Sequence, residues 1–132
     1  MKRGLQLILG LLSLIPLIVA ILGLTSGLGR WLPAKAITPE FDSHYRYITG
    51  FYISLAVTAW WIIPNIEQHK TALRILSGAI FMGGLGRVIS FWQVGAPSPL
   101  ALVFTSLELC FPLLLIWQAK LPHNRQSRIS QG

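Results

Sequence analysis

Hydrophobic residues fall into four long runs along the chain, at residues 5–29, 45–64, 71–93 and 98–119. Each run is long enough for a helix to cross the hydrocarbon layer of a bilayer, which takes about 20 residues. Because lipid offers no partner to unpaired backbone groups, each run predicts a helix. The pattern therefore predicts an all-α integral membrane protein, a four-helix bundle with antiparallel up-down topology.

The first run, LQLILGLLSLIPLIVAILGLTSGLG, predicts a helix with a kink at Pro16, which has no N–H for the helical ladder. A signal peptide is the alternative, with Lys2 and Arg3 as its basic start and the Ala-Lys-Ala of residues 34–36 as its cleavage site. The apolar stretch of a signal peptide is only about 7 to 15 residues long. We therefore expect the first helix to be retained.

The composition supports a membrane protein. Only 11% of the 132 residues are charged and 53% are hydrophobic, so the chain has too few charges to cover a water-facing globule of this size. The length and the short connections between the runs predict a single domain over residues 1–132. Residues 120–132 are expected to form a basic cytoplasmic tail.

The formal charge of +7 comes mainly from basic residues at the ends of the apolar runs. Such residues face anionic lipid headgroups, so membrane lipids are the expected partners. A membrane-protein complex or a second copy of the chain is a further possible partner. Nucleic acid is not an expected partner. One side of the bundle carries seven basic residues: Lys2, Arg3, Lys70, Arg74, Lys120, Arg125 and Arg128. The other side carries three: Arg30, Lys35 and Arg46. This difference predicts a multi-pass protein of the cell membrane with both termini in the cytoplasm.

Candidate metal ligands are sparse in the sequence. Cys110 is the single cysteine, which excludes a metal site built on cysteines. The three histidines, His44, His69 and His123, are expected on opposite membrane faces, so no histidine-rich site forms within one chain. The sequence indicates no cofactor and no metal.

Two ionisable residues lie well inside apolar runs, Arg87 in FMGGLGRVISFW and Glu108 in FTSLELCFP. A charge at a helix centre costs about 2.5 to 3.5 kcal/mol on insertion scales, so each residue needs a partner. At about 1.5 Å per residue, Arg87 lies about 9 Å and Glu108 about 15 Å from the outer ends of their helices, an offset that an arginine side chain spans. The sequence therefore predicts an ion pair between them. Its role is open between a clasp that fixes helix register and a ligand or proton site.

The small residues around Arg87 predict close helix packing. Ala79, Gly83, Gly86 and Ser90 recur at helical spacing, and the segment GGLG, with Gly83, Gly84 and Gly86, lacks the spacing of a phosphate-binding loop. Pro112 lies four residues after Glu108 and leaves the Glu108 carbonyl without its helical donor. A carboxylate and a free carbonyl at one position favour an arginine, a hydroxyl, a water or a ligand there.

The segment FDSHYRYITGFY places polar residues at the start of the second run. Asp42 and Arg46 are spaced to pair along one helix face, and Asp42 or Ser43 is expected to cap the helix. His44 and Tyr47 share a neighbouring face. In a compact bundle, one outward-opening polar pocket is expected to be lined by six residues: Asp42, His44, Arg46, Tyr47, Arg87 and Glu108.

Three segments, DSHYRYITGFYISLAV, GGLGRVISFWQVGAPSP and LELCFPLLLIWQ, resemble the small bacterial membrane-protein family called domain of unknown function 4345. The resemblance covers roughly residues 40–119 and implies a four-helix membrane domain and no assigned reaction. It marks eight positions: Asp42, His44, Arg46, Gly50, Gly83, Gly84, Arg87 and Glu108. We assign Gly50, Gly83, Gly84 and Gly86 to helix packing.

Two functions remain open at this point. The first is an accessory membrane protein, or one that binds a lipid or a small hydrophobic ligand, in which the Arg87–Glu108 pair holds the bundle together. The second is a membrane enzyme or redox component that acts on a lipid-like, quinone or isoprenoid molecule. In that protein Glu108 would act as an acid or base, and His44 as a proton relay.

Overall fold

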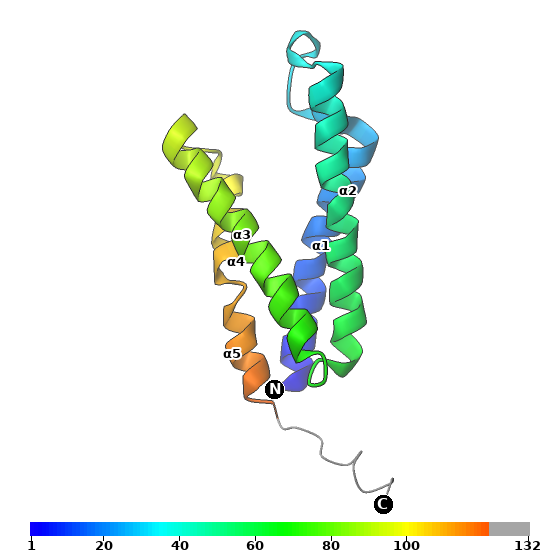
Figure 1. Ribbon diagram of the computed structural model, residues 1–132, viewed down its shortest axis with the longest axis vertical. Coiled ribbons are helices and arrows are strands. Elements are labelled where there is room, and N and C mark those ends of the chain that lie inside the picture. Colours follow the sequence, from blue (N-terminus) through cyan, green and yellow to red (C-terminus); the bar gives the residue numbers. More distant parts are fainter. Residues whose placement is uncertain (122–132) are drawn as a thin grey trace, which may run out of the picture. The chain divides into compact units, whose positions relative to one another are not determined.

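A computed structural model describes residues 1–121, and within them all regular structure is helical (Figure 1). The α-helices are α1 (Lys2–Ser26), α2 (Pro39–Ile62), α3 (Lys70–Val94), α4 (Pro99–Cys110) and α5 (Leu113–Ala119). Three short 3-10 helices lie between α1 and α3: η1 (Gly27–Arg30), η2 (Ala34–Ala36) and η3 (Ile63–Asn65). The predicted tail from residue 122 onward, with His123, lies outside the described residues.

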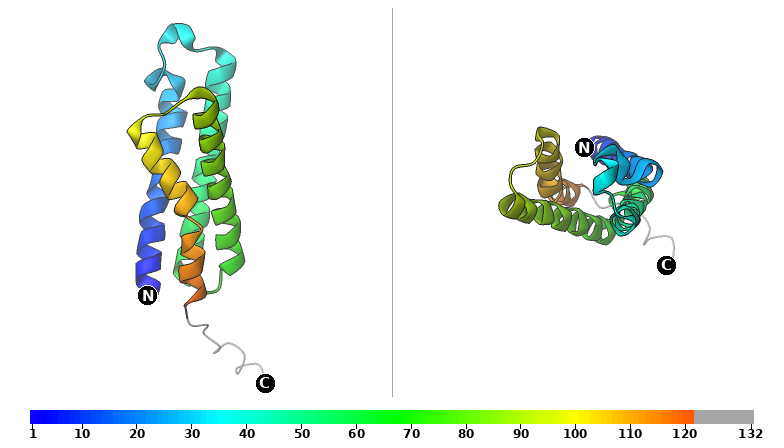
Figure 2. Two further views of the ribbon diagram at one scale, coloured as in Figure 1. Left: turned by 90° about the vertical axis from the view of Figure 1, so that its left-hand side faces the viewer. Right: turned by 90° about the horizontal axis from the view of Figure 1, so that it is seen from above.

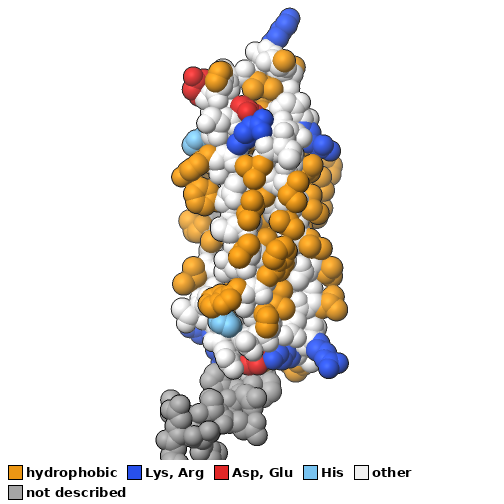
Figure 3. All heavy atoms as spheres, turned by 90° about the vertical axis from the view of Figure 1, so that its right-hand side faces the viewer, with side chains coloured by type: hydrophobic (Ala, Val, Ile, Leu, Met, Phe, Trp, Pro, Cys, Tyr) orange, Lys and Arg blue, Asp and Glu red, His pale blue; other side chains and the backbone are white. Residues whose placement is uncertain are grey.

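Four helical segments are long and apolar enough to cross a membrane, which agrees with the four predicted runs. They are Lys2–Arg30, Pro39–Asn65, Lys70–Val94 and Pro99–Ala119. Large apolar side chains such as Ile18, Ile75 and Ile89 are 55%, 70% and 57% exposed. Figure 3 shows hydrophobic side chains over the middle of the face on which α2 lies. Surfaces of this kind suit contact with lipid.

The second helix begins six residues earlier than predicted. Its start is set by Thr38, whose Oγ1 accepts a hydrogen bond from the Phe41 N–H at 3.3 Å, and by Pro39 in the first turn. Neither Asp42 nor Ser43 is therefore the cap, and the prediction of such a cap is wrong. The apolar run begins about 1.7 turns inside the helix. Thr-Pro-Glu is a stronger start signal than the onset of hydrophobicity. The segment FDSHYRYITGFY lies wholly within α2.

The fourth run forms two helices with a turn between them. Pro112 has no N–H, and the Phe111 N–H donates to the Glu108 carbonyl at 3.4 Å. The predicted free carbonyl of Glu108 is thus wrong, since it keeps one long hydrogen bond. The Leu114 N–H then bonds the Phe111 carbonyl at 3.0 Å, and α5 follows. In contrast, α1 continues through Pro16.

The described chain divides into two compact units. We call residues 6–64 the α1–α2 unit, and residues 1–5 with the described residues from Asn65 onward the α3–α5 unit. The single domain predicted for residues 1–132 stays a prediction.

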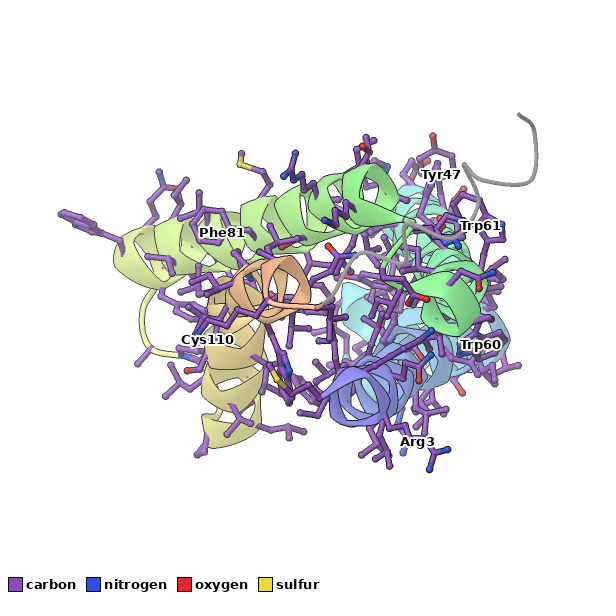
Figure 4. All side chains as sticks on the ribbon, turned by 90° about the horizontal axis from the view of Figure 1, so that it is seen from below. Arg3, Tyr47, Trp60, Trp61, Phe81 and Cys110 are labelled. Carbon is purple, nitrogen blue, oxygen red and sulfur yellow. The ribbon has the colours of Figure 1, made fainter. Side chains whose placement is uncertain are left out.

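In the α1–α2 unit the two helices pack through small residues. A Cβ added at Gly23 would lie 2.6 Å from the Thr49 Cβ, so α1 and α2 approach closely at this level. The Trp60 indole N–H donates to the Ser13 hydroxyl at 2.8 Å, and the Gln6 amide donates to the Ile63 carbonyl at 2.7 Å. In Figure 4, Trp60 lies on the side of α2 nearer to α1, while Trp61 points away from it.

In the α3–α5 unit, α4 and α5 run alongside α3 (Figures 1 and 2). The Gln118 amide donates to the Ile66 carbonyl and fixes the end of α5 to the turn before α3. The first residues of the chain belong to this unit, in which Lys2 Nζ lies 2.6 Å from Glu67 Oε1. The hydrogen bond from Lys2 holds the pKa of the Glu67 carboxyl below its usual range.

Candidate functional site

Arg87 and Glu108 form an ion pair between α3 and α4, as their depths predicted. Arg87 Nε lies 2.9 Å from Glu108 Oε2. Oε2 is buried and accepts no hydrogen bond from the described residues, so the Arg87 N–H is not aimed along the line that joins the two atoms. The side chains stay 37% and 23% exposed. The pair is therefore a close charge contact that leaves hydrogen-bonding capacity unused on both sides.

The close approach of α3 to α4 at this level depends on a glycine. A Cβ added at Gly84 would lie 3.1 Å from the Glu108 Cβ and 3.1 Å from Leu109 Cδ2. Added at Gly83 or Gly86, a Cβ would meet no described atom within 4 Å, and at Gly50 it would meet Leu24 Cδ2 at 3.8 Å. Among the four glycines assigned to packing, Gly84 is thus the one that sets the distance between the Arg87 and Glu108 helices.

Asp42 and Arg46 form the second polar cluster, in the α1–α2 unit. Arg46 Nε donates to Asp42 Oδ2 at 2.7 Å, which is the pairing that their spacing predicted. Asp42 Oδ1 accepts from the Leu28 N–H at 2.9 Å, and Arg46 Nη1 donates to the Leu24 carbonyl. Both side chains therefore satisfy backbone groups at the end of α1, where helical partners are missing. In this cluster their role is structural.

Gly27 belongs to the same cluster and was not singled out in the sequence. Its φ is +54°, and a Cβ there would lie 2.9 Å from Arg46 Cζ. A glycine of positive φ after the last helical residue is a common helix ending. The Ser-Gly at positions 26–27 was the available signal, but the predicted helix was extended to residue 29.

His44 and Tyr47 lie on another face of α2. At about 100° per residue, His44 is about 200° and Tyr47 about 140° around the helix from Asp42. The two rings stack with centroids 6.3 Å apart, and Tyr47 meets Phe51 edge-on at 5.0 Å. His44 is exposed, Tyr47 is 64% exposed, and Figure 4 shows Tyr47 pointing away from α1. The structure thus brings Asp42 together with Arg46, and His44 together with Tyr47, but it does not bring these two pairs together.

The six candidate residues fall into the two units. Asp42, His44, Arg46 and Tyr47 belong to the α1–α2 unit, while Arg87 and Glu108 belong to the α3–α5 unit. A pocket lined by members of both units stays a prediction. Among residues 1–121, no three His, Cys, Asp or Glu side chains are grouped so that they could hold a metal ion.

Comparison with known proteins places the chain in a family. No curated protein and no solved structure matches it. The family model for a domain of unknown function matches residues 4–119, which include all five α-helices except the first two residues of α1. Both polar clusters and the predicted packing glycines lie within this match. The chain therefore belongs to the family described as domain of unknown function DUF4345.

Proposed function

We propose that this protein is a multi-pass membrane protein that binds a lipid-like or small hydrophobic molecule, and that the Arg87–Glu108 pair is the polar contact for that molecule. The observation that carries the proposal is the incomplete bonding of the pair. A guanidinium has five N–H donors. Among the described residues Arg87 makes one polar contact, from Nε to Glu108 Oε2 at 2.9 Å, and its Nη1 and Nη2 donors have no protein partner.

The membrane environment makes this unused hydrogen-bonding capacity energetically costly. In water the free donors and the carboxylate would be hydrated, but lipid tails provide no acceptor, and an unsatisfied polar group in an apolar medium costs several kcal/mol. Arg87 and Glu108 both lie inside segments that are long and apolar enough to span a membrane. An oxygen-bearing molecule that reaches the pair from the bilayer would remove this cost.

A role of the pair as a helix clasp alone is the competing account. A Cβ added at Gly84 would lie 3.1 Å from the Glu108 Cβ and from Leu109 Cδ2, so α3 and α4 are also in close contact through this glycine. A pair needed only as a clasp would also favour a fully hydrogen-bonded geometry, because such bonds are what offset the cost of burying two charges. Both observations favour a binding role.

The proposal includes the protein's location and partners. We place it in a bacterial cell membrane as an antiparallel four-helix protein with both termini in the cytoplasm, because basic residues are concentrated on that side. Membrane lipids are its immediate neighbours. A complex with another membrane protein or with a second copy is compatible with the many exposed apolar side chains.

Native mass spectrometry of the protein released from mild detergent tests the proposal. We expect the wild type to retain a hydrophobic molecule that the double variant Arg87→Met/Glu108→Leu lacks. The matched control is Lys2→Met/Glu67→Leu, which removes the other ion pair of the same unit and should keep the bound molecule. Equal retention by all three proteins would contradict the proposal. Chemical turnover of the retained molecule would instead favour a membrane enzyme or redox component.

A further inference from the structure

The fourth membrane segment is interrupted two residues after Glu108. α4 ends at Cys110 and α5 begins at Leu113, and the proline between them has no N–H. Glu108 lies in the last turn of α4, and its carbonyl accepts one long hydrogen bond, from the Phe111 N–H at 3.4 Å. Interrupted membrane helices recur at the binding sites of membrane transporters, because their ends expose polar backbone where a ligand can reach it.

The charges around this interruption restrict the ligand. The C-terminal end of a helix carries partial negative charge, and Glu108 adds a carboxylate at the same end. Arg87 supplies one positive charge 2.9 Å away, so the formal charges of the pair cancel. The site therefore presents acceptors on the α4 side and donors on the α3 side, with no formal charge in excess.

From this arrangement we infer that the ligand's polar group is a neutral hydroxyl of a lipid-like alcohol or phenol, which donates to Glu108 and accepts from Arg87. This inference rests on the proposed function. A phosphate or carboxylate would be repelled by Glu108 and by the end of α4, and an ammonium group would be repelled by Arg87. A ketone or an ether accepts from Arg87 but has no proton to donate to Glu108. Of these groups, only a hydroxyl uses both sides of the pair.

Three probes that share one hydrocarbon chain separate these possibilities: farnesol, farnesyl methyl ether and farnesyl phosphate. Binding to the full-length protein in detergent micelles is measured by titration calorimetry. We expect farnesol to bind at least about tenfold more tightly than the ether or the phosphate, because a hydrogen bond to a charged group is lost with the ether and a repulsion is added with the phosphate.

The variant Glu108→Gln tests the origin of the preference. It removes the negative charge beside Arg87, so the preference should shift from farnesol toward farnesyl phosphate. Glu67→Gln, which removes a carboxylate outside the pair, should leave the order of the probes unchanged. If Glu108→Gln does not fold, the order of the three probe affinities for the wild-type protein tests the inference by itself.

The outcomes separate this inference from the proposed function. Tighter binding of the phosphate by the wild type, lost in Arg87→Met/Glu108→Leu, would overturn the hydroxyl inference and leave a binding role for the pair. Equal binding of all three probes would overturn both. Binding of none of them, by a protein that retains a molecule in native mass spectrometry, would overturn the hydroxyl inference only.

Discussion

Arg87→Met and Glu108→Leu should each lower the free energy of unfolding in detergent by about 3 to 5 kcal/mol, because each leaves one charge between the helices without its partner. The double variant should recover most of that loss, since two apolar residues of similar size remove both charges from an apolar surrounding. Unfolding in detergent followed by circular dichroism gives the four free energies of this double-mutant cycle.

The short distance between Arg87 and Glu108 is the reason to expect a coupling energy between the two substitutions. At 2.9 Å between Arg87 Nε and Glu108 Oε2, the substitutions cannot act independently. Under the proposed membrane placement, the exposed portion of the pair faces apolar chains, which do not screen charge, so partial exposure should reduce the effect little. Additive losses in the double variant would show that the pair does not exist in the folded protein.

The second large effect is expected at Gly27. Gly27→Ala should destabilise the protein by about 1 to 3 kcal/mol from backbone strain alone, because alanine disfavours the positive φ of +54°. The new Cβ would also lie 2.5 Å from Arg46 Nη2, so the contacts of Asp42 and Arg46 with the end of α1 would have to shift. The midpoint of thermal unfolding measures the combined loss.

Gly29→Ala is the control for this prediction. A Cβ at Gly29 meets no described atom within 4 Å, and its φ lies outside the positive range, so the substitution should be close to neutral. Equal stability of the Gly27→Ala and Gly29→Ala proteins would contradict the structural role assigned to Asp42 and Arg46.

Hydrophobic run length predicted the helical class and the number of candidate spans, because the thickness of a bilayer fixes both. The third helix, expected at residues 71–93, is observed at Lys70–Val94. Capping determined the ends that were predicted less well. The Thr38 hydroxyl and Pro39 start α2 six residues before the apolar run, and Pro112 divides the last run at a point that hydropathy does not register.

The site could be predicted where one helix, or two neighbouring helices, determine the geometry. The four-residue spacing gave the Asp42–Arg46 contact, and the rise per residue gave the Arg87–Glu108 contact across a short turn. The contacts of Asp42 and Arg46 with Leu28 and Leu24 could not be predicted, because they depend on how α1 ends at Gly27. The rotation of about 100° per residue places His44 and Tyr47 on another face of α2 than Asp42 and Arg46.

The most direct test of the binding role is an experimental structure of the wild-type protein in lipid nanodiscs, at a resolution that shows side chains and bound lipids. Our account predicts non-protein density with a polar group within hydrogen-bonding distance of the Arg87 guanidinium and beside Glu108. It also predicts that this density is absent from the Arg87→Met/Glu108→Leu protein. An Arg87 whose donors are all bonded to protein groups, with no such density at the pair, would contradict the account.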